Sequence, residues 1–215
     1  MIGVDAAAGI AVVALGLVLT PGPNMIYLVS RSITQGRLAG LVSLLGVAVG
    51  FVVYLGAAAA GIATVFTRVP AAYTALKLLG AGYLLYLAWQ AVRPGGPALY
   101  SPKELPADGA GRLFLMGLVT NLLNPKIAVL YVSLLPQFID PDRGSVIVQS
   151  VALGAVQISI ALTVNLLIVL TASTTADFLA RRPTWVRTQR YFMGGVLGAL
   201  ALRLATERSR GTAAG

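Results

Sequence analysis

The sequence predicts an all-α membrane protein of six transmembrane helices, arranged as two inverted three-helix repeats with the first helix of each repeat broken by proline. Three observations lead to this fold class. Of the 215 residues, 57% are hydrophobic and 11% are charged, a composition unlike that of a soluble domain. Six apolar stretches are each long enough to cross a bilayer core, which needs about 20 helical residues. Two of these stretches, one in each half of the chain, are interrupted by proline.

The first apolar stretch, residues 6–30, is broken at residues 20–24, Thr-Pro-Gly-Pro-Asn. We call this segment the first break. Two prolines remove backbone donors and clash with the preceding turn, so they disfavour a continuous helix. In hydrocarbon, unpaired backbone groups are tolerated only where protein or a water-filled cavity covers them. Proline breaks at matching positions of two halves therefore point to a transporter's binding site. A kink that only helps neighbouring helices to pack is the alternative.

The second and third apolar stretches follow through short polar connections. The second, residues 38–66, carries Gly46 and Gly50 at the spacing that lets two helices approach closely. The third, residues 72–92, contains tyrosine and tryptophan side chains, which we expect in packing or at the membrane interface.

A polar linker divides the chain, and three more apolar stretches follow it. The second half contributes residues 112–138, 146–171 and 188–204. Residues 112–138 are interrupted at Asn124-Pro125, which we call the second break. The predicted units are a first repeat, a polar linker, a second repeat and a disordered tail, at residues 1–93, 94–111, 112–206 and 207–215.

The two repeats must enter the membrane in opposite orientations, because each has an odd number of spans. This geometry brings both breaks toward one point near the bilayer midplane. Lys and Arg are more frequent in the loops at 31–37, 93–112 and 181–190 than on the opposite side, which favours an outside N-terminus.

Lys126 lies in mid-stretch, directly after the second break. An ammonium at the bilayer centre costs at least about 2.5–3.5 kcal/mol, so an intramembrane lysine indicates a functional site. A helix start also offers free N–H groups and partial positive charge, which suit a carboxylate. The alternatives are that Lys126 snorkels to the interface, or that it lies in water on a re-entrant segment.

The candidate substrate-binding residues gather at the two breaks and are Pro21, Gly22, Pro23, Asn24, Asn121, Asn124, Pro125 and Lys126. Gln157 and Asn165 share nearly one helical face and are candidates, with Tyr54, for lining a cavity. Interhelical hydrogen bonding, or packing for Tyr54, is the alternative. The seven acidic residues lie in loops or at the ends of stretches, so no carboxylate is expected at mid-membrane. The candidates for proton coupling are Asp140, Asp5 and Asp177 near the ends of stretches, Lys126, and the substrate's own amine.

Several function classes are disfavoured by composition. The chain has neither cysteine nor histidine, so we expect no metal site and no cofactor. The net charge of +9 comes from residues at the ends of apolar stretches, which fits membrane anchoring rather than nucleic-acid binding. An enzyme is not expected, because Ser30, Ser32 and Lys126 are the only nucleophile candidates and nothing pairs them convincingly. A scaffold protein would leave Lys126 unexplained.

These motifs resemble those of the lysine exporter (LysE/RhtB) superfamily of bacterial amino-acid exporters. The resemblance covers nearly the whole chain and is most specific at residues 20–32, 35–37, 80–89, 121–126 and 135–141. It implies six spans in inverted repeats and export driven by the proton gradient. Asparagine follows proline directly at Pro23-Asn24, which resembles the homoserine, threonine and leucine branch. The strict lysine and arginine exporters have a different motif there. Many relatives carry a histidine near Tyr54, and its role cannot be transferred.

We therefore expect a secondary transporter that exports small neutral amino acids or derivatives, similar to homoserine, threonine or leucine. The substrate carboxylate would bind at the helix starts near Asn24 and Lys126, and its ammonium at carbonyls freed by the breaks and at the asparagines. The alternative is a cation, metal or other small-metabolite exporter of the same superfamily. The expected location is the bacterial cytoplasmic (inner) membrane, as a multi-pass protein. The expected partners are an amino acid, the lipid bilayer and, as a candidate, further copies in a homo-oligomer.

Overall fold

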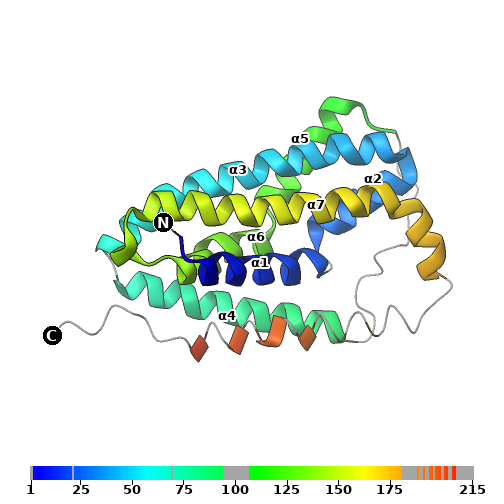
Figure 1. The fold of residues 1–215 in the computed structure, drawn as a ribbon. Coiled ribbons are helices and arrows are strands. Elements are labelled where there is room, and N and C mark those ends of the chain that lie inside the picture. The colour runs from blue at the N-terminus through cyan, green and yellow to red at the C-terminus, as the bar shows by residue number, and fades with distance from the viewer. Residues whose placement is uncertain are drawn as a thin grey trace.

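A computed structural model of the chain describes residues 2–20, 22–68, 70–93 and 107–180, and single residues between 188 and 206. All the regular elements in these residues are helices (Figure 1), which confirms the predicted all-α class. Pro21, most of the predicted linker, the continuous course of the sixth stretch and the predicted tail lie outside the described residues.

The helices begin and end close to the predicted stretches. They are α1 (Val4–Leu19), α2 (Pro23–Gln35), α3 (Arg37–Arg68), α4 (Pro70–Val92), α5 (Ala110–Leu122), α6 (Pro125–Val129), the π-helix η1 (Leu130–Leu134), the 3-10 helices η2 (Leu135–Phe138) and η3 (Pro141–Arg143), and α7 (Val146–Ala180). The predicted linker, residues 94–111, is described only from residue 107 onward. Helix α5 already begins at Ala110, after the N-cap residue Gly109.

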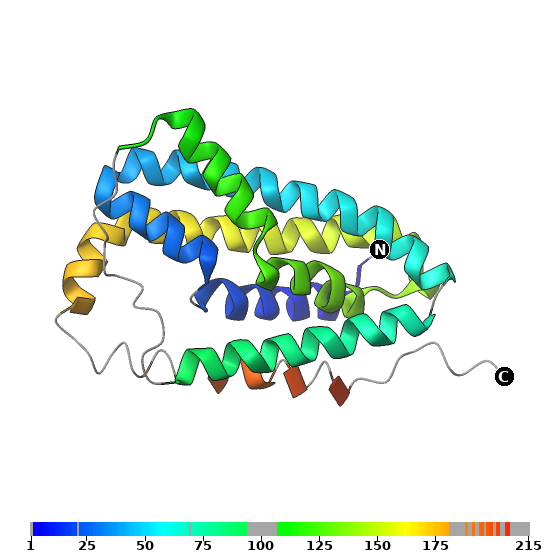
Figure 2. The ribbon, with the colours of Figure 1, turned by 180° about the vertical axis from the view of Figure 1, so that it is seen from behind.

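Both predicted breaks are present as bends. The axes of α1 and α2 differ by 53°, and the axis of α5 differs by 48° from that of the segment Pro125–Phe138. Pro23 and Pro125 are the first residues of α2 and α6, the position where the missing N–H of proline removes no helical hydrogen bond. Figure 2 shows the green ribbon of α5 turning sharply into α6.

The described residues contain two helices long and apolar enough to cross a membrane, within Arg37–Gly61 and Val146–Ala172. The number rises to four if each bent pair forms one span. Helices α3 and α7 pack side by side along most of their length (Figure 1). Many of their large apolar side chains point outward, including Leu45, Val52 and Leu167, as expected for a surface that faces lipid.

Glycines let α3 and α5 pack backbone against backbone. A Cβ atom at Gly46 would collide with the carbonyl oxygen of Phe114, and one at Gly117 would collide with that of Ser43. This confirms the close helix approach predicted from Gly46 and Gly50. Because α5 packs on α3 while α7 packs on α1, α2 and α3, the two halves of the chain interlock.

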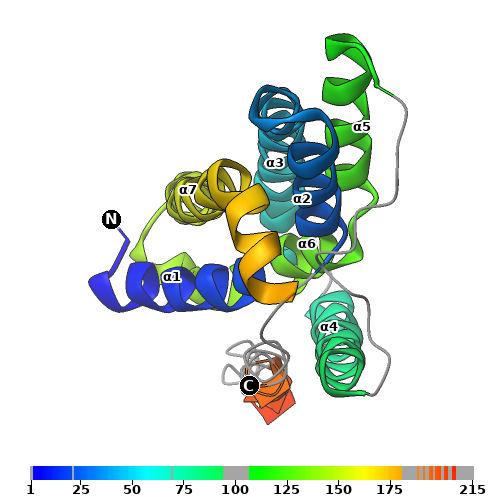
Figure 3. The ribbon, with the colours of Figure 1, turned by 90° about the vertical axis from the view of Figure 1, so that its right-hand side faces the viewer.

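The interlocked packing places α6 in the middle of the molecule. Figure 3 looks along α3, α4 and α7 and shows α6 with α1, α2, α4, α5 and α7 around it. The break between α1 and α2 and the break between α5 and α6 therefore meet inside the bundle.

Candidate functional site

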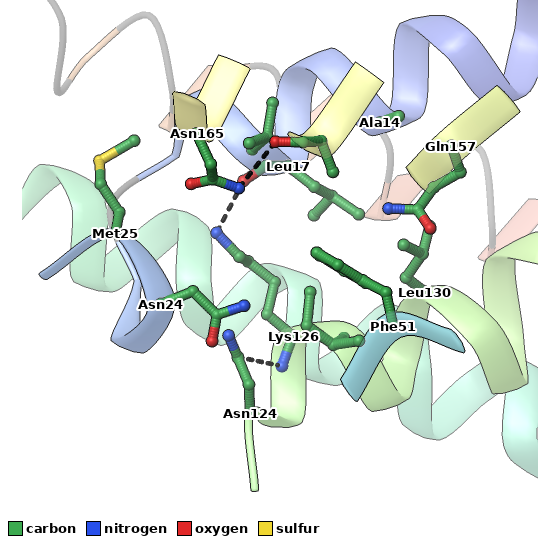
Figure 4. Close-up of a pocket in the computed structure, with 13 residues that line it drawn as sticks. Ala14, Leu17, Asn24, Met25, Phe51, Asn124, Lys126, Leu130, Gln157 and Asn165 are labelled. Carbon is green, nitrogen blue, oxygen red and sulfur yellow. Dashed lines mark hydrogen bonds between the residues drawn. The ribbon is translucent and has the colours of Figure 1, made fainter. Parts of the chain in front are cut away.

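A small cavity lies where the two breaks meet (Figure 4). Its polar wall is formed by Asn24, Asn124, Lys126, Gln157 and Asn165. The rest of the wall is apolar and comes from α1, α2, α3, α6, η1 and α7. The cavity measures about 20 Å³, which is room for about one water molecule. It is therefore contracted and too small to hold an amino acid.

Lys126 connects the two breaks. Its side chain is buried, with 5% of the residue exposed. Its Nζ donates hydrogen bonds to the carbonyl oxygens of Leu17 at 2.6 Å and Thr20 at 2.8 Å. Carbonyls at the C-terminal end of a helix have no partner within the helix, so the end of α1 supplies acceptors that an ammonium can use. Lys126, which follows the second break, thus donates hydrogen bonds to carbonyl oxygens that lie at the first break.

Gly22 leaves the space through which Lys126 reaches these carbonyls. A Cβ atom at Gly22 would lie 3.0 Å from Nζ and 3.2 Å from Cε of Lys126. The backbone at Gly22 is extended, with φ −165° and ψ 177°, so the conformation itself would accept any residue. Space for the lysine therefore accounts for glycine at this position.

The starts of the two inner helices are capped differently. At the second break, Asn124 is the N-cap of α6 and its Oδ1 accepts a hydrogen bond from the backbone N–H of Lys126 at 3.1 Å. At the first break, Gly22 is the N-cap of α2 and supplies no side-chain acceptor. The N-terminus of α2 is consequently the less satisfied of the two, and it borders the cavity through Asn24 and Met25.

Three buried asparagine side chains have amide atoms without a hydrogen-bond partner. These atoms are Nδ2 and Oδ1 of Asn24, Nδ2 and Oδ1 of Asn121, and Nδ2 of Asn124. Buried polar atoms are normally hydrogen-bonded, so each exception needs an explanation. Asn24 and Asn124 face the cavity, where a ligand could bind them. Asn121 lies against α3 instead, because a Cβ atom at Gly50 would be 2.7 Å from its Oδ1.

Helix α7 contributes the two residues expected from their shared face. Gln157 and Asn165 both lie in the cavity wall. The Tyr131 hydroxyl of η1 donates to Gln157 Oε1 at 2.6 Å, and Asn165 Nδ2 donates to the carbonyl of Ala161 at 2.8 Å. The π-helix η1 was not foreseen from the sequence; single π turns within α-helices are frequent at functional sites.

Tyr54 and Asp140 lie outside the cavity wall. The Tyr54 hydroxyl donates to the carbonyl oxygen of Leu122, the last residue of α5, at 2.7 Å, and its ring stacks on Tyr131 with centroids 5.6 Å apart. Asp140 lies in the turn before η3, where its carboxylate pairs with Arg143 at 3.2 Å.

Sequence reasoning missed a buried charge cluster at the junction of α2 and α5. Asp108 pairs with Arg31 at 2.7 Å and with Arg112 at 3.1 Å, and the side chains of Asp108 and Arg31 are almost fully buried. The sequence predicts a polar linker at residues 94–111, which includes Asp108. Its spacing of four residues from Arg112 was the available signal, but the partner on α2 is distant in sequence.

Comparison with known proteins identifies the family. The family of LysE type translocators matches residues 15–208. The chain belongs to this family. A leucine efflux protein of Salmonella typhimurium (strain LT2) is 27% identical over 203 residues, covering 91% of this chain and 92% of that protein. A leucine efflux protein of Klebsiella pneumoniae is 29% identical with the same coverage.

Another relative has no transport activity in its name. The uncharacterized membrane protein YahN of Escherichia coli (strain K12) is 29% identical over 191 residues, covering 87% of this chain and 83% of that protein. No solved structure matches the chain.

Proposed function

We propose that this LysE type translocator exports small neutral amino acids of the leucine class across the bacterial cytoplasmic membrane. The names of the leucine efflux relatives support the cargo and the direction. The observation that carries the proposal is the cavity between the breaks. It combines one ammonium, several amides and an apolar wall, and no acidic side chain of the described residues lines it.

The cavity offers complementary groups for each part of such a substrate. The unsatisfied N-terminus of α2 and the amides of Asn24 and Asn124 suit the carboxylate. The carbonyls of Leu17 and Thr20 suit the ammonium. The aliphatic and aromatic remainder of the wall suits an uncharged, apolar side chain.

The absence of an acidic partner in the described wall also favours neutral cargo over cationic cargo. A lysine or arginine substrate would bring an additional side-chain charge into this space, without a carboxylate of the described wall to balance it.

Transport requires the contracted cavity to open alternately to each side of the membrane. We propose that the first repeat, residues 1–93, and the second, residues 112–206, provide this movement as inverted repeats of three spans, with the N-terminus outside. The proton gradient would drive export, with Asp140 as the coupling candidate expected from the sequence. A homo-oligomer stays a prediction.

The first test is leucine efflux from bacterial cells loaded with a leucine-containing dipeptide. Cells expressing the protein should release leucine faster than vector controls, and an uncoupler should abolish the difference. Other dipeptides would rank the neutral amino acids. If no amino acid leaves faster than in the control, the proposed cargo is wrong.

Lys126→Met tests the site. We expect leucine efflux to fall to the vector level while the variant still inserts in the membrane, because the one charged group of the cavity wall is lost. Arg37→Gln, which changes an exposed cation at the start of α3, is the matched control and should retain efflux. Unchanged efflux in Lys126→Met would remove Lys126 from the site.

A further inference from the structure

We propose that Lys126 is the proton-coupling group, and that in the empty carrier its ammonium occupies the position that the substrate's ammonium takes in the loaded carrier. This inference rests on the proposed function. It locates the coupling step in the cavity itself instead of at Asp140, which lies outside the cavity wall.

The first argument is the chemistry of the two carbonyls. Leu17 O and Thr20 O hold the Lys126 ammonium at 2.6 and 2.8 Å. An amino-acid substrate carries the same donor, a primary ammonium with three N–H bonds. Both ammonium groups need acceptors when they are buried, and these carbonyls of α1 are the acceptors that the first break exposes at the cavity. One pair of acceptors cannot hold both groups in the same place, so substrate and Lys126 compete for it.

The second argument is that a displaced Lys126 ammonium would find no acidic side chain among the described residues of the cavity wall. In the proposed binding mode, the substrate's carboxylate is already engaged by the start of α2 and the amides of Asn24 and Asn124. Helix α7 carries no charged residue between Val146 and Ala172. On α2, Arg31 is engaged with Asp108. An ammonium without acceptors is costly in such a place. We therefore infer that Lys126 leaves the carbonyls as a neutral amine and gives its proton to water.

The other titratable groups described on the surrounding helices do not face Lys126 as proton acceptors. They are tyrosines that have hydrogen-bond or ring partners of their own, or charged residues that lie farther away. Tyr27 of α2 donates to the carbonyl of Leu113, Tyr54 of α3 to that of Leu122, and Tyr131 of η1 to Gln157. Helix α1 has only Asp5, in its first turn and far from Leu17, and α5 has Arg112, which pairs with Asp108. Helix α4 has Tyr83 and Tyr86, which pair with each other; the side chain of Lys77 lies outside the described residues.

These steps give a balanced exchange of one proton for one amino acid. On the cytoplasmic side the zwitterion binds, its ammonium takes the two carbonyls, and the Lys126 ammonium releases a proton to cytoplasmic water. On the other side the substrate leaves and the Lys126 amine takes up a proton from outside water. The protonated lysine then returns to the carbonyls, and the empty carrier turns inward with that proton. A proton gradient directed inward would thus drive export.

The proposal separates two transport modes that a simple binding role for Lys126 would not separate. Exchange of leucine for leucine uses only loaded carriers and needs no lysine at the carbonyls. Net efflux requires the empty carrier to return, and this is the step in which Lys126 replaces the substrate's ammonium. Loss of the lysine should therefore stop net efflux and spare exchange.

The experiment uses the purified full-length protein in liposomes loaded with radioactive leucine. Exchange is measured with excess unlabelled leucine outside, and net efflux is measured with an imposed pH gradient while an internal dye reports proton entry. Wild type should show both modes, with one proton entering per leucine. For Lys126→Met we expect exchange within about threefold of wild type and a net efflux lower by about a hundredfold or more, since only the empty return is blocked.

Lys126→Gln provides a second neutral variant whose amide can still donate to a carbonyl, in case Lys126→Met does not fold. Folding is checked by a single symmetric peak in detergent gel filtration. Arg37→Gln serves as the control, and we expect it to retain both exchange and net efflux.

Three outcomes would overturn the inference. A folded neutral variant that loses exchange together with net efflux would show that Lys126 only binds substrate or supports structure. Proton-coupled efflux that survives in Lys126→Met but is lost in Asp140→Asn would move the coupling to Asp140. Wild-type protein that exchanges no neutral amino acid would refute the proposed function along with this inference, whereas the first two outcomes leave the proposed function standing.

Discussion

The two helix breaks are built from similar residues, but they are satisfied in different ways. At the second break, the last carbonyl of α5 accepts the Tyr54 hydroxyl, and the start of α6 is capped by Asn124. At the first break, two carbonyls at the end of α1 depend on Lys126, and the start of α2 has no side-chain cap. The second break is supported by its own surroundings, and the first is completed by a residue from the second.

This difference indicates which break responds to the substrate. Groups already engaged in permanent hydrogen bonds cannot bind a ligand without losing them. At the first break the Lys126 side chain donates to two carbonyls of α1, and Asn24 has no partner for its amide. The groups of the first break are therefore the ones that exchange hydrogen-bond partners during transport, whereas the second break holds Lys126 in position.

The largest effect expected in a test of this comparison comes from Gly22→Ala. The new Cβ would lie 3.0 Å from Lys126 Nζ, so the ammonium must shift by a few tenths of an ångström, which weakens its hydrogen bonds to the carbonyls of α1. We expect net leucine efflux to fall by about tenfold, which corresponds to about 1.4 kcal/mol.

Gly56→Ala is the matched control for this change, because a Cβ atom there would meet nothing within 4 Å. Its efflux should equal that of wild type. If Gly22→Ala and Gly56→Ala transported leucine equally well, the contact between Gly22 and the lysine would have no role in transport.

The paired asparagines sharpen the comparison with a smaller effect. Asn124→Ala removes the N-cap of α6 and should lower the free energy of unfolding by about 1 kcal/mol. Asn24→Ala removes two buried atoms that have no partner, so stability should stay the same or rise, while the KM for leucine rises by about threefold. Thermal unfolding in detergent and transport kinetics in liposomes measure the two quantities. If Asn24→Ala had a lower free energy of unfolding than Asn124→Ala, the inferred difference between the two breaks would be wrong.

Much of this arrangement could be predicted from the sequence because its causes are local. The proline breaks follow from the missing N–H of proline, and the close packing at Gly46 follows from a spacing of four residues. The burial of Lys126 inside the bundle agrees with its place in the middle of a long apolar stretch. The pairing of Gln157 and Asn165 on one wall follows from helical periodicity.

What the sequence could not provide are partners distant along the chain. Lys126 was expected to support a carboxylate site at its own helix start, whereas its Nζ reaches back to Leu17 and Thr20. Asp108 was assigned to a linker, although it is buried against Arg31 of α2. In both cases the neighbouring residues in the sequence give no sign of the distant partner. The contact arises only because α5 and α6 pack against α1 and α2.

The smallest effect is expected for Tyr54→Phe, which tests how firmly the second break is held. The variant keeps the ring stacked on Tyr131 and removes only the hydrogen bond to the carbonyl of Leu122, so the free energy of unfolding should fall by about 1 kcal/mol. Tyr83→Phe is the control, since the described contact of Tyr83 is a ring contact with Tyr86, and its stability should be unchanged. The KM for leucine should not change in either variant, because neither hydroxyl lies in the cavity wall. A raised KM in Tyr54→Phe without loss of stability would place Tyr54 in the wall of the opened cavity, and its hydroxyl would then contact the substrate together with Asn124.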